Sequence, residues 1–236
     1  EAELLAQLDG TPDDERNARL YGEWYLGGLN VYNYNPTQHR ADPAHYHPSW
    51  PHMIVVDPAA SGKAGVMFFA HKPGGTEWFI VRGDYVSGAA ASDLLDEIDE
   101  MTAGYNIIRR VSDPHEAWFI KEGHKRKQYY LGVPKKNERK KELIKNLQEA
   151  LNDGKIKLTG WVPLLVAELE SCMWKEGADD KIIGSSRFHL LDCAQYGVDM
   201  LPKIRDLPEQ HGWQQQLKLA HRKQVDKRAN VTDKVK

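Results

Sequence analysis

Three apolar runs separated by short polar segments in the first half of the chain predict three consecutive strands. An apolar run over residues 53–57 ends on an acid, and a polar stretch over residues 58–63 separates it from the next apolar run. The tripeptide Pro73-Gly74-Gly75 marks a tight turn before a third run. Because connections this short join antiparallel neighbours, the runs predict a meander. The expected strands are residues 53–57, 64–72 and 76–88.

A helical period replaces this pattern after the meander. Apolar side chains recur every three or four positions in residues 90–105 and again in residues 140–151, as on one face of an amphipathic helix. Pro202 ends the last helical stretch. The expected elements here are a helix over 90–105, a strand over 106–113, a helix over 140–151, a strand over 155–160 and helices over 163–174 and 187–201. This order predicts an α/β fold, with a mixed sheet flanked by helices on both faces.

The ends of the chain show weaker patterns. Residues 25–52 are rich in Gly, Asn, Pro, His and Tyr and follow neither period. The chain begins without Met inside an expected short helix, Glu1–Leu8, and we expect it to be part of a longer protein. We therefore interpret residues 1–52 as a linker or remnant, 53–205 as one domain, and 206–236 as a basic C-terminal tail.

Composition indicates a soluble globular protein. Of the 236 residues, 41% are hydrophobic and 28% are charged. The longest apolar runs, such as residues 53–56, are far shorter than the roughly 20 residues that a membrane-spanning helix needs, so no membrane association is expected. Two cysteines, Cys172 and Cys193, are too few for a disulfide scaffold or a cysteine-based zinc site.

The net charge of −2 conceals an uneven distribution. Residues 1–24 hold seven acidic and two basic residues, whereas residues 121–141 hold nine basic and two acidic ones, and residues 217–236 hold seven and two. Basic segments of this kind suit contacts with nucleic-acid phosphates that read no sequence, although solvated surface lysines are the commoner explanation. The candidate DNA-binding residues are Lys121, Lys125, Arg126, Lys127, Lys135, Lys136, Arg139 and Lys140.

Four residues form the candidate chemistry. Asp57 and Asp113 each follow an apolar strand and precede a proline, and strand ends are where α/β sheets place their sites. His189 and Asp192 are three residues apart and share one face of an expected helix. Carboxylates suit Mg²⁺ or Mn²⁺, and the imidazole favours Mn²⁺. Each residue taken singly also has an ordinary structural explanation. Asp57 and Asp113, each before a proline, could only mark turns, and His189 could be a half-buried helix histidine. Asp192 could be a helix carboxylate paired with Arg187 or Lys203.

The order of these elements is a strand ending in VVDPA, the meander, a helix, a strand ending in VSDPH and the helix HLLDCAQY. This order resembles the nuclease domain of phage terminase large subunits. These subunits are the DNA-packaging motors of tailed phages. Residues 15–24 are similar to the segment that joins their ATPase to the nuclease, and residues 155–174 to their strand and helix with an acid near its end. The resemblance covers residues 13–202. It implies a ribonuclease H/RuvC-integrase-like fold.

The resemblance also implies a function. The chain would be an endonuclease that cleaves concatemeric double-stranded viral DNA in the host cytoplasm, at the procapsid portal. Asp57, Asp113 and Asp192 would be catalytic and would hold one or two Mg²⁺ or Mn²⁺ ions with His189, Asp57 bridging both. The implied partners are DNA, the portal protein, the small terminase subunit and the ATPase domain of the same polypeptide.

Two features depart from the family. Residues 60–65 lack the first glycine and the Ser/Thr of a phosphate-binding loop, so no ATPase activity is expected. No second acid adjoins Asp192, and His189 would take its place. The alternatives are a Holliday-junction resolvase or ribonuclease H-type nuclease of the same fold, and a non-catalytic DNA-binding or assembly module. A zinc site within the histidine-rich residues 39–52 is the least favoured.

Overall fold

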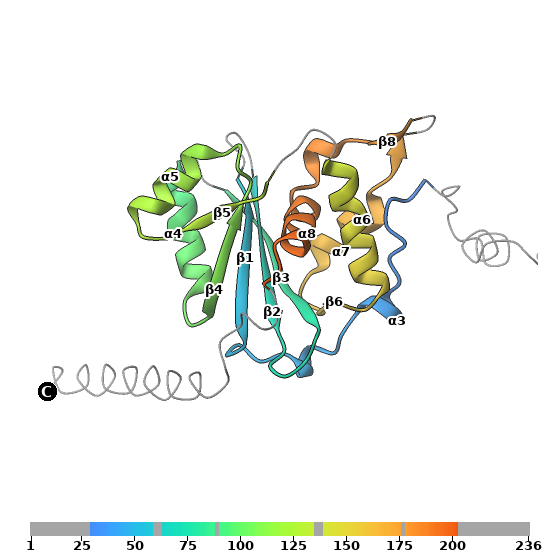
Figure 1. Cartoon of the computed structure of the whole chain (residues 1–236), viewed down its shortest axis with the longest axis horizontal. Helices are drawn as coiled ribbons and strands as arrows, with labels where there is room; N and C mark the ends of the chain where they lie inside the picture. Colours follow the sequence, from blue (N-terminus) through green and yellow to red (C-terminus); the bar gives the residue numbers. More distant parts are fainter. Residues whose placement is uncertain (1–28, 59–62, 88–89, 135–138, 176–177, 203–236) are drawn as a thin grey trace, which may run out of the picture.

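The computed structural model describes residues 29–58, 63–87, 90–134, 139–175 and 178–202. Their centre is a six-stranded sheet in the order β5-β4-β1-β2-β3-β6 (Figure 1). A two-stranded ribbon, β7 (Trp174–Lys175) with β8 (Ala178–Ile182), lies beside it. The strands of the main sheet are β1 (Pro51–Asp57), β2 (Lys63–His71), β3 (Trp78–Ser87), β4 (Asn106–Ser112), β5 (Tyr130–Gly132) and β6 (Ile156–Leu158).

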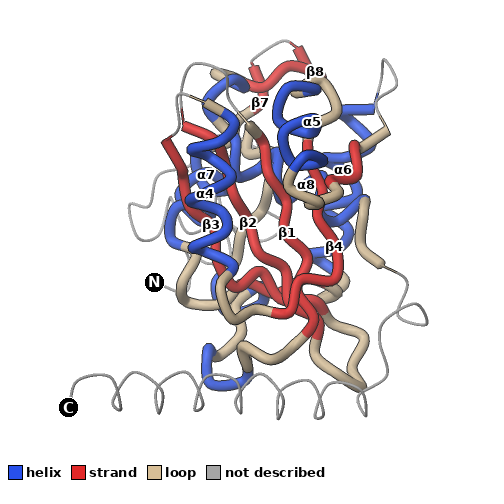
Figure 2. The backbone as a smooth tube through the Cα atoms, turned by 90° about the vertical axis from the view of Figure 1, so that its left-hand side faces the viewer, coloured by secondary structure: helices blue, strands red, loops and turns tan. Residues whose placement is uncertain are grey.

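The sheet is mixed, as the sequence predicts. Strands β1, β2 and β3 form the expected antiparallel meander, whereas β4 pairs parallel to β1, β5 parallel to β4 and β6 parallel to β3. Figure 2 shows β3, β2, β1 and β4 running side by side. Every residue of β1 is buried, which explains why its sequence is a continuous apolar run rather than an alternating one.

Helices cover both faces of the sheet, which confirms the predicted α/β class (Figure 1). Alternate residues of β1 separate two cores: Ile54 and Val56 pack with α4 and α5, and Met53 and Val55 with α6, α7 and α8. The helices are α4 (Ala91–Thr102), α5 (Ala117–Lys125), α6 (Arg139–Asn152), α7 (Pro163–Ser171) and α8 (His189–Asp199). Among the described residues, no helix is both long and apolar enough to cross a bilayer.

The described part of the segment before β1, residues 29–50, packs against the core. It contains a short helix, α3 (Pro36–His39), and a 3₁₀ turn, η1 (Pro43–His45). Val31 and Tyr32, only 2% exposed, belong to the same core as α6 and α8. The expected short helix at residues 1–8 and the basic tail lie outside the described residues.

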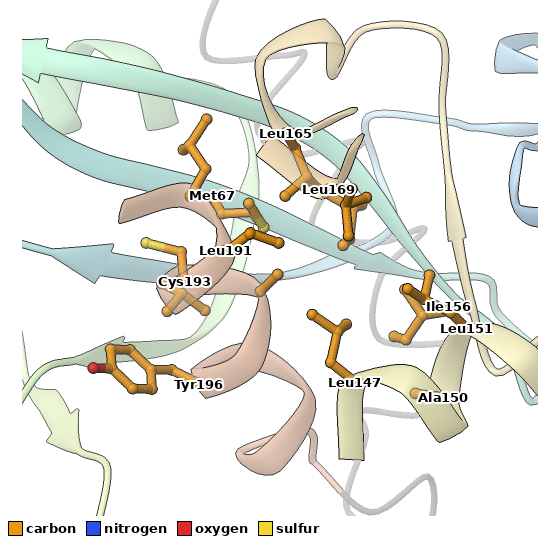
Figure 3. Close-up of a cluster of buried hydrophobic side chains, with 14 of the residues drawn as sticks. Met67, Leu147, Ala150, Leu151, Ile156, Leu165, Leu169, Leu191, Cys193 and Tyr196 are labelled. Atoms are coloured by element: carbon orange, nitrogen blue, oxygen red, sulfur yellow. The ribbon is translucent and has the colours of Figure 1, made fainter. Parts of the chain in front are cut away.

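The helix α8 lies very close to the meander. At Gly197, an added Cβ atom would come within 2.2 Å of the Phe69 ring of β2, so only glycine allows this approach. Figure 3 shows Leu191 and Cys193 of α8 beside Met67 of β2, and all three are buried in one core. The helix is therefore held at a fixed depth on the sheet, and its first turn reaches the end of β1. A second 3₁₀ turn, η2 (Ser185–Arg187), leads into it.

Candidate active site

The parallel pairing of β1 with β4 brings two of the predicted acids to one edge of the sheet. Val56 is opposite Ser112, so Asp57 and Asp113 follow at the carboxyl ends of neighbouring strands. The backbone N–H of Asp113 donates to the carbonyl of Val56 at 3.3 Å. Both acids are buried, at 7% and 8% exposure. Carboxylates so shielded from water need partners, and each has one within the protein.

The partner of Asp57 is His189, the first residue of α8. Its Nδ1 lies 2.7 Å from Asp57 Oδ2. This hydrogen bond raises the pKa of His189 above its ordinary value, against the opposite effect of burial. The imidazole is thus biased towards its charged form beside a carboxylate.

A glycine allows this contact. In the sheet, Asp57 of β1 is opposite Gly65 of β2, and Gly65 is opposite Tyr85 of β3. A Cβ atom on Gly65 would lie 2.8 Å from the carbonyl oxygen of His189 and 3.1 Å from its Cβ. The first turn of α8 therefore rests directly on the bare backbone of β2, in the same row as Asp57.

Asp192 lies one helical turn further along α8. Its Oδ1 accepts an ion-paired hydrogen bond from Nζ of Lys140, in the first turn of α6. Burial raises the pKa of Asp192, and the charge of Lys140 opposes this effect. Of the two partners that the sequence offered, Arg187 instead places its guanidinium 5.0 Å from the ring centroid of Phe188, and Lys203 lies outside the described residues.

Tyr196 of α8 is a hydrogen-bond partner of Asp113. Its hydroxyl donates to Asp113 Oδ2 at 3.2 Å, while Asp113 Oδ1 accepts from the N–H of His115 at 2.9 Å. Burial, followed by the charges of Asp192, Asp113 and Asp57, raises the pKa of Tyr196. The hydroxyl therefore stays protonated and remains a donor to Asp113.

Glu168 of α7 is a functional candidate that the sequence reasoning left out. Its carboxylate is buried and accepts from the N–H of Leu191 at 2.8 Å, the N–H of Leu190 at 3.4 Å and the hydroxyl of Tyr85. Because Phe188 precedes α8 and offers no capping oxygen, Glu168 satisfies the helix start from a distance. Burial raises its pKa. The available signal was the pair of acids, Glu168 and Glu170, in the mainly apolar helix expected over residues 163–174.

The side chains of Asp57, Asp113, Asp192 and His189 are of the chemical types that bind a hard divalent cation. Three carboxylates and one imidazole are ligands that Mg²⁺ and Mn²⁺ accept in proteins. In the described part of the chain, however, no three His, Cys, Asp or Glu side chains lie close enough together to hold one ion. Asp57, Asp113 and Asp192 instead face His189, Tyr196 and Lys140.

The candidate DNA-binding residues do not form one free basic surface. Arg126 pairs with Asp96, Lys125 with Glu122 and Arg139 with Asp199. Lys140 faces Asp192, as described above, and Lys135 and Lys136 lie outside the described residues. Lys121 and Lys127 have no ion pair within the described ranges.

The two tyrosines beside this basic segment differ. Tyr129 is 67% exposed, whereas Tyr130 is 4% exposed and packs against Phe119 of α5. Tyr129 is thus the one available for a ligand.

The histidines of residues 39–52 do not form a cluster. His39 is buried and its Nδ1 accepts from the N–H of Asn35, whereas His52 is buried against the hydroxyl of Tyr46. His45 and His47 are exposed. Within the described residues these side chains form no zinc-binding group.

Comparison with known proteins finds matches by structure and not by sequence. No family model and no curated protein matches the sequence. The large terminase of a thermophilic bacteriophage, in complex with ADP, matches with a TM-score of 0.65 and 17% identity, over 80% of this chain and 51% of that chain. The chain thus spans about half the length of that terminase.

Isolated nuclease domains match over most of their own length. The nuclease domain of the P22 large terminase matches with a TM-score of 0.57 and 12% identity, over 75% of this chain and 94% of that domain. The large terminase nuclease of the thermophilic phage G20c with bound magnesium matches with a TM-score of 0.52 and 16% identity, over 66% of this chain and 84% of that chain. At these identities the likeness shows a shared fold, and it is the fold that the resemblance in the sequence predicts.

Proposed function

We propose that the chain is the nuclease part of a phage large terminase and cleaves double-stranded DNA during genome packaging, with a divalent metal ion as cofactor. The observation that carries this proposal is that Asp57 and Asp113 lie at the carboxyl ends of two neighbouring parallel strands, where His189 of α8 contacts Asp57 and Tyr196 of α8 contacts Asp113. The fold shared with terminase nucleases, one of them with bound magnesium, supports it.

Asp57, Asp113 and Asp192 would hold the metal, with His189 as a further ligand or as the group that orients Asp57. A bound Mg²⁺ or Mn²⁺ would supply charge stabilisation and an activated water for hydrolysis of the phosphodiester bond, and two ions would serve both the attacking and the leaving oxygen. The protein's own part is positioning. Tyr196 orients Asp113, and Glu168 fixes the first turn of α8, which carries both His189 and Asp192.

The wider role is the one that the resemblance in the sequence implies. The substrate would be concatemeric viral DNA in the host cytoplasm, and the partners would be the portal protein, the small terminase subunit and an ATPase domain of the same polypeptide. Of the basic residues, Lys121 and Lys127 are the first candidates for phosphate contacts, because they have no ion pair in the described part of the chain.

The test is cleavage of supercoiled plasmid DNA with Mn²⁺ or Mg²⁺. The wild-type chain should nick or linearise the plasmid, and Asp57→Ala, Asp113→Ala and Asp192→Ala should each lower the rate by at least about a hundredfold. A triple variant that cleaves at the wild-type rate would refute the site.

A panel with a four-way junction and an RNA–DNA hybrid separates the related nucleases. Preference for the junction or the hybrid over duplex DNA would favour a resolvase or a ribonuclease H. Metal-independent DNA binding without any cleavage would favour the non-catalytic module.

A further inference from the structure

Lys140 is the cation that the protein itself supplies to the candidate metal site. It lies in the first turn of α6, and its ammonium contacts Oδ1 of Asp192. The neighbouring Arg139 contacts Asp199, seven residues further along α8. Two adjacent basic residues of α6 thus hold acids at both ends of α8, and only the first pair lies at the candidate site.

The charges around Asp192 show why a cation is needed there. Asp57 and Glu168 add negative charge to the surroundings of Asp192, and His189 opposes it. The side chain of Asp192 is only 22% exposed, so water screens little of this repulsion. In the described structure, Lys140 offsets the charge that a metal ion would otherwise offset.

The two partners differ in their freedom to move. The side chain of Lys140 is 46% exposed, and its ammonium is a point charge on a flexible four-carbon stem. It can therefore leave Asp192 for solvent, or for a nearby phosphate, without disturbing the core. Asp192 is fixed by the backbone of α8 and cannot follow it.

We propose that Lys140 competes with the catalytic metal ion for Asp192, and that a DNA phosphate releases this competition by binding the ammonium. Metal and DNA would then strengthen each other's binding, because each favours the state in which the ion pair is broken. The nuclease would bind its metal weakly until DNA is in place. This inference rests on the proposed function and adds to it a coupling between cofactor and substrate.

The first experiment measures Mn²⁺ binding to the chain without DNA, by isothermal titration calorimetry. Lys140→Met should bind Mn²⁺ about tenfold more tightly than the wild type, because the competitor is gone. The matched control is Lys145→Met, which removes the same charge from the same helix at a residue paired with Glu149. This control should leave the affinity unchanged.

A second substitution shows whether the gain passes through Asp192. In the Asp192→Asn background, Lys140→Met should bring no gain in Mn²⁺ affinity. An equal gain in that background would mean that Lys140 acts only as a nearby positive charge, and would overturn the competition.

The second experiment measures DNA binding by fluorescence anisotropy, with a labelled duplex of about 20 base pairs and Ca²⁺ as the metal, and with the duplex checked for integrity on a gel. Ca²⁺ should tighten DNA binding by the wild type about tenfold and should have clearly less effect on Lys140→Met. Equal effects in the two proteins would refute the coupling.

The outcomes also separate this inference from the proposed function. If no variant binds Mn²⁺, the metal site itself is wrong, and both proposals fail. If the wild type binds Mn²⁺ and Lys140→Met binds it equally well or more weakly, the competition alone is refuted.

Discussion

Gly65→Ala tests whether the close approach of α8 to β2 creates the site. The added Cβ would lie 2.8 Å from the carbonyl oxygen of His189 and 2.9 Å from its carbonyl carbon. An ordinary contact begins at 3.4 Å, so the start of α8 must move by about 0.6 Å. Both clashing atoms belong to backbone, which cannot rotate away. We expect a loss of about 1–3 kcal/mol in the free energy of unfolding, as for other overpacked sites.

The same displacement should reduce catalysis. It would lengthen the 2.7 Å contact between His189 Nδ1 and Asp57 Oδ2 to about 3.3 Å, which weakens this hydrogen bond, and it would carry Asp192 with it. Misplacing reacting groups by up to an ångström can cost about a hundredfold in rate, so we expect a loss of about ten- to a hundredfold. The assays are urea denaturation and the initial rate of Mn²⁺-dependent plasmid nicking.

Gly83→Ala is the matched control, since it makes the same change in the neighbouring strand β3. Its Cβ would have Met67 Cε at 3.6 Å and Leu190 Cδ2 at 3.9 Å as nearest atoms, which are ordinary contacts. We expect stability within about 0.5 kcal/mol of the wild type and full activity. If Gly65→Ala behaves like this control in both assays, the close approach has no role in forming the site.

Three further substitutions have defined outcomes. Glu168→Gln should lower the free energy of unfolding, measured by urea denaturation, by about 1.5–3 kcal/mol, because the buried acceptor of the Leu190 and Leu191 N–H groups loses its charge. An unchanged value would show that Glu168 does not stabilise the start of α8. Tyr196→Phe should raise the Mn²⁺ concentration for half-maximal cleavage several-fold by releasing Asp113, and an unchanged value would contradict that role. Burial lowers the pKa of His52 to about 4, so on acidification the unfolded chain takes up a proton first, and stability is lost as pH falls from 6.5 towards 4. Between pH 7 and pH 5 the loss of unfolding free energy from His52 amounts to about 2 kcal/mol, and His52→Phe should remove it from the pH dependence measured by urea unfolding. The same pH dependence in wild type and variant would refute the role of His52.

The meander could be predicted from the sequence because its strands are buried and its connections short. The alternating exposure of a half-buried strand was not needed, since apolar runs bounded by turn residues were a sufficient signal. The segment that follows β4 was harder. Helix α5 and strand β5 lie within a basic stretch, where charge hides the period of the helix, and β5 has only three residues.

The sequence predicts a set of candidate site residues, and that set stays a prediction, but it does not predict the geometry between them. Asp57 and Asp113 become neighbours only because β4 pairs parallel to β1, and no local pattern specifies that choice. Lys140 meets Asp192 across 52 positions of sequence, and it was interpreted as a DNA contact for lack of any sign of this partner. Local patterns report burial and period, whereas partners of this kind are decided by how helices pack.

The two edges of the sheet are its shortest strands, and this affects how copies of the protein can associate. In the part of the chain that the structure describes, β5 and β6 have three residues each, whereas the four inner strands have seven to ten. The outer side of β6 is also bonded to the segment before β1, where the N–H of Ala41 donates to the carbonyl of Leu158 at 2.8 Å. Little unpaired strand backbone is left as a template for another chain. The sheet is therefore protected against edge-to-edge aggregation, and any assembly of several copies would be built through side chains on the helical faces rather than by extending the sheet.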